Sequence, residues 1–202
     1  MASGIAAYDV NVPRTIHEGP VGRRPPAWWG MICLVATEAA LFFFLLYSYF
    51  YMATHSSVWP PEGPPDLKLA LPNTALLLAS SATMWWAESG IRAGRSARLR
   101  IGLVITIVLG AVFAAVQGLE WSQKPFGPAT DAYGSLFFTI TGFHGAHVIV
   151  GLIILAYILL RASLGHFTAE RHLAVSTAAI YWHFVDVVWL FVFTSLFLTP
   201  RL

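Results

Sequence analysis

Five ionisable residues stand inside long apolar stretches of the chain: Glu38, His144, His147, His183 and Asp186. His147 follows His144 by three residues, and Asp186 follows His183 by three, so each pair shares one face if its stretch is helical. Ionisable residues in apolar surroundings are costly, and they mark candidate functional sites for that reason.

Three kinds of chemistry suit these residue types. Two histidines three residues apart, with a third histidine and carboxylates nearby, are ligands that iron, zinc or copper accept. Titratable groups that reach one another through water can instead relay protons. In the third interpretation the side chains hydrogen-bond across helices and hold a bundle together, at about 0.6 kcal/mol for each contact. Spacing alone favours this structural role and leaves the other two open.

The composition indicates which elements must position these residues. The 202 residues are 57% hydrophobic and 11% charged, and the mean hydropathy is +0.66. Soluble domains carry roughly 25% charged residues, so we interpret the chain as an integral membrane protein. Its single cysteine, Cys33, excludes an internal disulfide, a cysteine-rich metal site and covalent c-type haem attachment. The net charge of +2, dispersed among loops, predicts no nucleic-acid partner.

The fold class predicted is an all-α polytopic bundle, because five apolar runs are each long enough to cross the hydrocarbon layer. The expected spans are residues 28–51, 69–87, 101–119, 133–160 and 173–198. At a rise of about 1.5 Å per residue, the five ionisable residues would meet in one layer near the bilayer midplane. We expect residues 28–202 to form this single domain and residues 1–27, which are polar and proline-rich, to form a flexible cytoplasmic tail.

The distribution of lysine and arginine predicts the orientation, because basic loops stay on the cytoplasmic side. The tail and the loops after the second and fourth spans hold nine of these residues, and the opposite segments hold three. This difference predicts a cytoplasmic N-terminus and a periplasmic C-terminus. On the outer side, Gln117 and Glu120 are either a packed polar pair or an interfacial cap, and we favour the cap.

Two segments resemble signatures of subunit III of the haem-copper respiratory oxidases, in its five-helix form. They are residues 141–148, TGFHGAHV, and residues 181–191, YWHFVDVVWLF. Thr37-Glu38 before a phenylalanine-rich stretch, Trp59-Pro60-Pro61 and Pro125-Phe126 agree with the same family. The similarity extends from about Gly30 to the C-terminus.

The resemblance implies a noncatalytic core subunit of an aerobic terminal oxidase of the cytochrome c oxidase type, which reduces oxygen to water and pumps protons. It implies no active site and no metal in this chain, with haem and copper carried by partner subunits, and it therefore favours the structural role for the buried histidines. Glu38 would lie near the face toward the catalytic subunit, and Arg161 and His166 would hold phospholipid head groups. The subunit would stabilise the catalytic centre and support proton uptake.

The expected partners are subunit I, as the main contact, subunit II, and further a subunit IV or a larger respiratory supercomplex, in a bacterial cytoplasmic membrane. Many family members have seven spans, whereas this chain lacks the first two. The quinol-oxidase versions lack them too, and accessory proteins of nitric oxide reductases share the five-helix pattern. Both therefore stay open as alternatives. A stand-alone membrane metalloenzyme or proton channel is the alternative from a different class.

Overall fold

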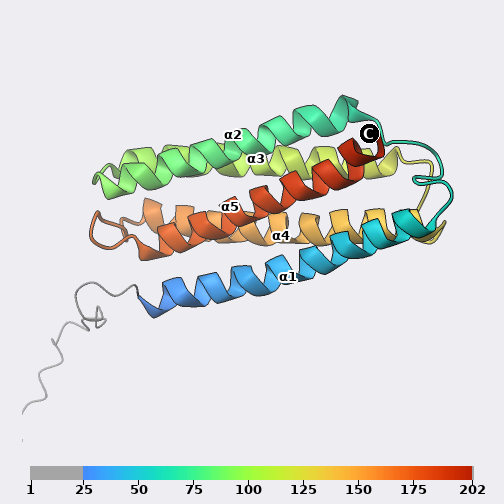
Figure 1. The fold of residues 1–202 in the computed structure, drawn as a ribbon. Helices are drawn as coiled ribbons and strands as arrows, with labels where there is room; N and C mark the ends of the chain where they lie inside the picture. The colour runs from blue at the N-terminus through green and yellow to red at the C-terminus, as the bar shows by residue number, and fades with distance from the viewer. Residues whose placement is uncertain (1–24, 202) are drawn as a thin grey trace, which may run out of the picture.

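The computed structural model describes residues 25–201, in which five long helices alternate in direction (Figure 1). The helices are α1 (Pro26–His55), α2 (Leu67–Arg92), α3 (Ser96–Ser122), α4 (Ala132–Ser163) and α5 (Leu173–Phe193). A π-helical turn, Thr194–Leu198, and a 3-10 turn, Thr199–Arg201, continue α5. The all-α prediction is confirmed. Residues 26 and 27, assigned above to the tail, already belong to α1, and residues 1–24 of the tail lie outside the described residues.

The starts of α1, α2 and α4 follow local sequence chemistry. Pro26 occupies the first turn of α1, where its missing N–H costs nothing. Asp66 precedes α2 and accepts a hydrogen bond from the Lys68 N–H at 3.0 Å, which lowers the pKa of this carboxyl from its usual value. Asp131 likewise precedes α4 and accepts from the Gly134 N–H at 2.6 Å.

Four of the five predicted spans have a matching helix that is long and apolar enough to cross a membrane. Among the described residues these are α1, α3, α4 and the segment Leu173–Arg201. The second helix, α2, has 26 residues but is more polar, with Asn73, Ser80, Ser81, Thr83 and Glu88 along it. Its composition does not establish a fifth span.

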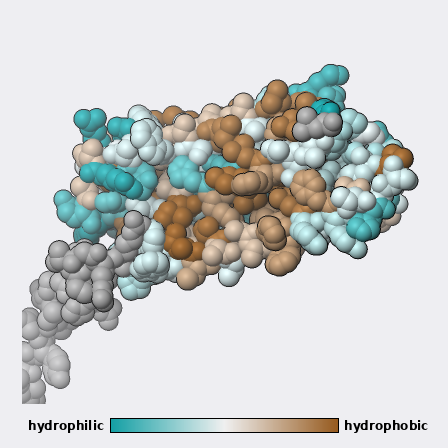
Figure 2. Space-filling model, viewed as in Figure 1, coloured by the Kyte–Doolittle hydropathy of each residue, from teal (hydrophilic) through white to brown (hydrophobic). Residues whose placement is uncertain are grey.

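The helices are arranged around α5. Helix α1 packs on α4 and α5, and α2 packs on α3 and α5, so that α1 and α2 flank α5 (Figure 1). In α1 only Phe42 and Tyr49 are buried, whereas most residues of α5 are buried. Hydrophobic residues cover much of the middle of the face seen in Figure 2, and hydrophilic residues gather toward its ends.

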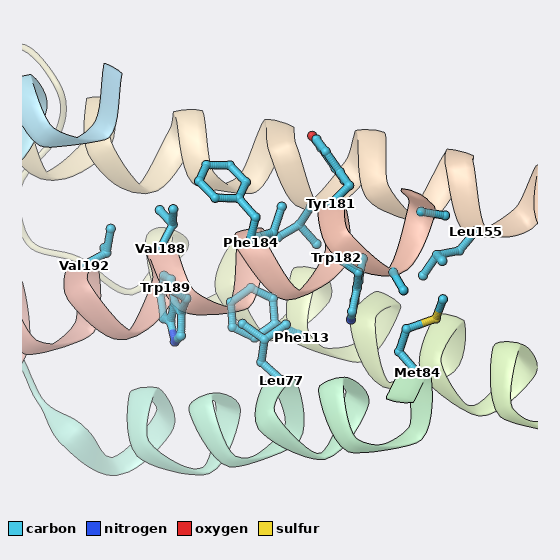
Figure 3. Close-up of a cluster of buried hydrophobic side chains, with 14 of the residues drawn as sticks. Leu77, Met84, Phe113, Leu155, Tyr181, Trp182, Phe184, Val188, Trp189 and Val192 are labelled. Atoms are coloured by element: carbon cyan, nitrogen blue, oxygen red, sulfur yellow. The ribbon is translucent and has the colours of Figure 1, made fainter. Parts of the chain in front are cut away.

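Two tryptophans of α5 form the centre of the core (Figure 3). Trp182 and Trp189 are fully buried, and each donates its indole N–H to a hydroxyl of α2. The acceptors are Ser80 Oγ, 3.1 Å from Trp182 Nε1, and Thr74 Oγ1, 2.9 Å from Trp189 Nε1. Phe113 of α3 packs edge-to-face on Trp189 with ring centroids 5.0 Å apart. These contacts fix α5 against α2 and α3.

Two glycines make room for the Trp182 ring. A Cβ at Gly110 would lie 2.7 Å from Trp182 Cη2, and a Cβ at Gly151 would lie 2.9 Å from its Cε3. Both distances are shorter than real Cβ contacts. Since the indole is held by Ser80, it cannot move aside without losing its hydrogen bond.

We predict that Gly151→Ala lowers the free energy of unfolding by about 1–3 kcal/mol through overpacking against Trp182. Thermal unfolding of the purified chain in detergent, followed by circular dichroism, measures the effect. Gly142→Ala is the matched control on the same helix, because no atom lies within 4 Å of a Cβ there. Equal midpoints for the two variants would show that the space around Trp182 is not filled.

Candidate functional site

Glu38 of α1 and His147 of α4 form a polar pair between their helices. His147 Nε2 lies 2.9 Å from Glu38 Oε2, and His147 Nδ1 lies 2.7 Å from the Phe143 carbonyl oxygen. Because a carbonyl only accepts, Nδ1 carries a proton. A single further proton then lies between Nε2 and Oε2, and the pair is neutral overall whichever atom holds it.

This polar pair is partly open to the outside of the bundle. The side chains of His147 and Glu38 retain 14% and 28% of their exposure. Phe42 covers the His147 ring edge-to-face, with centroids 5.2 Å apart, and the Tyr181 hydroxyl donates to the His147 carbonyl at 3.3 Å. Helices α1, α4 and α5 therefore meet at this point.

His144 lies in a different environment from His147. It is fully buried, and neither ring nitrogen has a hydrogen-bond partner among residues 25–201. Its ring lies among Phe42, Phe113 and Trp189, and the Trp189 centroid is nearest at 4.8 Å. His144 thus contributes an aromatic contact to the core.

His183 and Asp186 both lie near Ser81 of α2. His183 Nδ1 lies 2.7 Å from Ser81 Oγ, a hydrogen bond between α5 and α2. Asp186 is 3% exposed, and Ser81 is close enough to interact with it, yet no hydrogen bond of good geometry reaches either carboxylate oxygen from the described part of the chain.

The five ionisable residues therefore do not satisfy one another as a single layer. Only Glu38 and His147 bond directly, because a step of three residues turns a helical side chain by about 60°. That turn directs His144 into the core and His147 toward α1. Within residues 25–201, no group of three or more His, Cys, Asp or Glu side chains is placed to hold a metal ion.

Gln117 and Glu120 are buried, so the prediction of an interfacial cap is wrong. Their exposures are 3% and 4%, and Lys124 from the following loop pairs with the Glu120 carboxylate. Lys124 Nζ lies 2.8 Å from Glu120 Oε1, and it also lies over the Phe137 and Phe197 rings at 5.1 and 5.5 Å. The basic partner comes from the loop after α3 and could have been noticed from its i,i+4 spacing to Glu120.

Arg161 and His166 lie close together where α4 ends. The His166 backbone N–H donates to the Arg161 carbonyl at 3.1 Å, and the Arg161 guanidinium lies over the rings of Tyr157 and Phe167. Both side chains remain accessible at this end of the bundle.

Ser81, which was not assigned to the site from the sequence, could have been found as a polar residue at the same depth as His183.

Apolar helices held together by internal polar contacts define a multi-pass membrane protein of the bundle type. A family model described as cytochrome c oxidase subunit III matches residues 22–200. The chain is 45% identical over 181 residues to cytochrome c oxidase subunit 3 of Scyliorhinus canicula, covering 84% of this chain and 68% of that protein. The Arabidopsis thaliana protein of the same name is 41% identical over 177 residues, covering 84% and 67%.

The chain belongs to the cytochrome c oxidase subunit III family. The resemblance drawn from the two sequence signatures is confirmed. Membership makes the chain a subunit of an oxidase complex of the respiratory chain.

We predict that Glu38→Ala lowers the free energy of unfolding by about 1 kcal/mol, the scale of interhelical hydrogen bonds in membranes. Glu38→Gln should lower the free energy of unfolding by less, because the glutamine amide can donate a hydrogen bond to a neutral His147 Nε2. Thermal unfolding in detergent compares the two. A loss as large for glutamine as for alanine would mean that the Glu38–His147 bond does not stabilise the fold.

Lys124→Met should lower the free energy of unfolding more than Glu38→Ala does. It leaves the Glu120 carboxylate buried without a countercharge, at a cost of about 3–5 kcal/mol. The double variant Glu120→Gln/Lys124→Met removes both charges and should recover much of this stability. Chemical unfolding of the two variants measures the difference. If the double variant is no more stable than Lys124→Met, the ion pair is not the source of the effect.

Proposed function

We propose that the chain is a noncatalytic core subunit of an aerobic haem-copper terminal oxidase that reduces oxygen to water and pumps protons. In this proposal haem and copper reside in partner subunits, and the chain performs no redox step itself. The observation that carries it is the family match, which extends over residues 22–200. The main contact would be with the catalytic subunit I, with subunit II and a subunit IV or larger supercomplex as further partners.

The Glu38–His147 pair supports a binding role. A partly exposed ionisable pair deep in a span is costly against lipid, whereas a neighbouring protein helix can shield it. Glu38 would therefore help hold the chain against the oxidase. By stabilising its neighbour, the subunit would prolong activity during turnover and support proton uptake.

For the topology we propose that α2 also crosses the membrane, which gives five spans with a cytoplasmic N-terminus and an outer C-terminus. The distribution of basic residues at the two ends of the bundle supports this orientation. The loops 93–95 and 164–172 share one end (Figure 1), where six arginines lie, namely Arg92, Arg95, Arg98, Arg100, Arg161 and Arg171. Lys68, Lys124 and Arg201 lie at the other end.

Arg161 and His166 would bind the head group of a phospholipid at the basic end of the bundle. The accessible guanidinium of Arg161, braced by two aromatic rings, is suited to a phosphate. The proposed location is a bacterial cytoplasmic membrane. The relatives named above come from eukaryotes, so the family itself is not restricted to bacteria.

Purification through a tag on this chain, from native membranes in mild detergent, tests the proposal. We expect oxidase-type haem absorption and a copper-bearing companion in fixed ratio to the chain. Identifying the companion subunit that receives electrons would show whether cytochrome c or quinol is the electron donor.

A chain purified without any haem-bearing companion would contradict the proposal. Liposomes that contain only this chain provide the matching control, and we expect them to retain a pH gradient. Rapid loss of the gradient would instead favour a proton channel.

A further inference from the structure

A cleft of about 520 Å³ opens between α1, α2 and α5 at the basic end of the bundle. One wall of this α1–α2–α5 cleft is apolar and includes Trp28 and Ile32 of α1. At its mouth, Glu88 and Arg92 of α2 form an ion pair, with Nη2 2.6 Å from Oε1, and the Arg92 side chain is 60% exposed. His183 of α5 lines the deep end, ten residues and roughly 15 Å from the start of its helix. The cleft therefore runs from a charged mouth to a polar side chain at hydrocarbon depth.

A polar stripe connects the mouth of the cleft to its deep end. Ser81 and Glu88 of α2 are seven residues apart and lie on one face of their helix. Ser176 and His183 of α5 have the same spacing, and both line the cleft. His183 Nδ1 lies 2.7 Å from Ser81 Oγ, so the polar faces of α2 and α5 meet at the deep end. Charges at the mouth and polar groups along the wall favour water over acyl chains as the occupant.

Asp186 lies behind this stripe as a buried acid. It is 3% exposed, and neither carboxylate oxygen has a hydrogen bond of good geometry from the described residues. Ser81 interacts with this carboxyl and is bonded to His183, so its hydroxyl lies between the two groups. His183 Nε2 has no hydrogen-bond partner within residues 25–201. The three side chains therefore connect the buried carboxyl to the cleft.

No charged side chain of the described residues neutralises Asp186. Helix α5 packs on α1, α2 and α4, and at the cleft Glu88 interacts with His183 and pairs with Arg92. The other carboxyl and imidazole groups in the middle of these helices are Glu38, His144 and His147. None of them is among the groups that act on the Asp186 carboxyl. An isolated carboxylate in apolar surroundings is strongly unfavourable, so the neutral acid is the favoured form of Asp186.

We propose that the α1–α2–α5 cleft is a water-filled half-channel and that Asp186 exchanges its proton with this water through Ser81 and His183. The imidazole begins with its proton on Nε2. The Asp186 carboxyl gives its proton to Ser81 Oγ, the Ser81 hydroxyl gives its own to His183 Nδ1, and His183 Nε2–H gives one to water. The reverse sequence restores the neutral acid. Trp189, three residues further along α5, is fully buried and bonded to Thr74, so the relay reaches only the basic end.

This inference goes beyond the proposed function, because it assigns a proton-exchange site to the chain itself. The relay does not cross the bundle, so a membrane that contains the chain still holds a pH gradient. A helix of the oxidase beside the cleft would shield it from lipid and leave its basic end open to water. Failure of the relay would leave the assignment to an oxidase complex intact.

Infrared spectroscopy of the full chain in detergent tests the relay. The carbonyl stretch of a protonated carboxylic acid shifts when deuterium replaces its proton, and the band missing from Asp186→Asn belongs to Asp186. In heavy water we expect Ser81→Ala to slow the shift of this band by about a hundredfold, the lower end of what a positioned proton-transfer group contributes. Thr83→Ala is the matched control, because it removes another hydroxyl bond of α2, 2.8 Å long, to Thr106 of α3.

The control variant Thr83→Ala should exchange at the wild-type rate. The proposal is overturned if Asp186→Asn removes no carboxylic acid band, because Asp186 then holds no proton. It is also overturned if Ser81→Ala and Thr83→Ala exchange at equal rates. Circular dichroism of each variant confirms that the compared chains are folded.

A thiol reagent tests whether water fills the cleft. On a Cys33→Ser background, Ile180→Cys places a thiol on the cleft wall, seven residues after Leu173 at the start of α5. The control Val104→Cys lies outside the cleft on α3, eight residues after Ser96 at the same end, where valine is 46% exposed. In native membranes we expect a charged, membrane-impermeant methanethiosulfonate to label Ile180→Cys roughly tenfold faster, because only a hydrated thiolate reacts. Equal or slower labelling of Ile180→Cys shows a cleft without water and overturns the proposal.

Discussion

Hydrocarbon cannot form hydrogen bonds, and this constraint governs every polar side chain in the bundle. Several of them are satisfied between helices. Glu38 and His147 join α1 to α4, while Ser80 with Trp182, Thr74 with Trp189 and Ser81 with His183 join α2 to α5. Helix α2 is thereby fixed through its polar residues, which are also the residues that reduce its hydropathy. The same groups that weaken α2 as an isolated span stabilise it in the bundle.

Two of these contacts remain partly open on the outside of the bundle. Glu38 keeps 28% of its side-chain exposure, and His183 lines the α1–α2–α5 cleft. Without protein or water beside them, both would face lipid at a cost. In the proposed complex, helices of neighbouring subunits would cover both side chains and could offer them further hydrogen bonds. Family membership and the surface of the bundle therefore lead to one interpretation, in which the chain acts by binding.

The sequence predicted the five helices and the position of each ionisable residue along its helix, because apolar periodicity and helix length are local properties. The sequence did not predict which side chains these residues contact. Three-residue spacing placed His144 and His147 on related faces, but whether a face meets the core or a neighbouring helix depends on packing between distant segments. Gln117 and Glu120 illustrate the same limit, since Lys124 covers Glu120 only after the loop folds back over α3. Ser81 lies at about the depth of His183, but depth alone does not show that α2 packs against α5, and so the bond between the two side chains was not predicted.

The most direct test replaces the polar pair by leucine, as Glu38→Leu/His147→Leu, and compares the isolated chain with the assembled complex. Replacing both partners of a hydrogen bond by apolar groups of similar shape can be nearly neutral or stabilising. The account predicts that the unfolding midpoint of the isolated chain is unchanged or higher, while the haem recovered with the tagged chain falls. A lower midpoint with unchanged haem recovery would contradict it, because the pair would then serve the fold of this chain and not its partner.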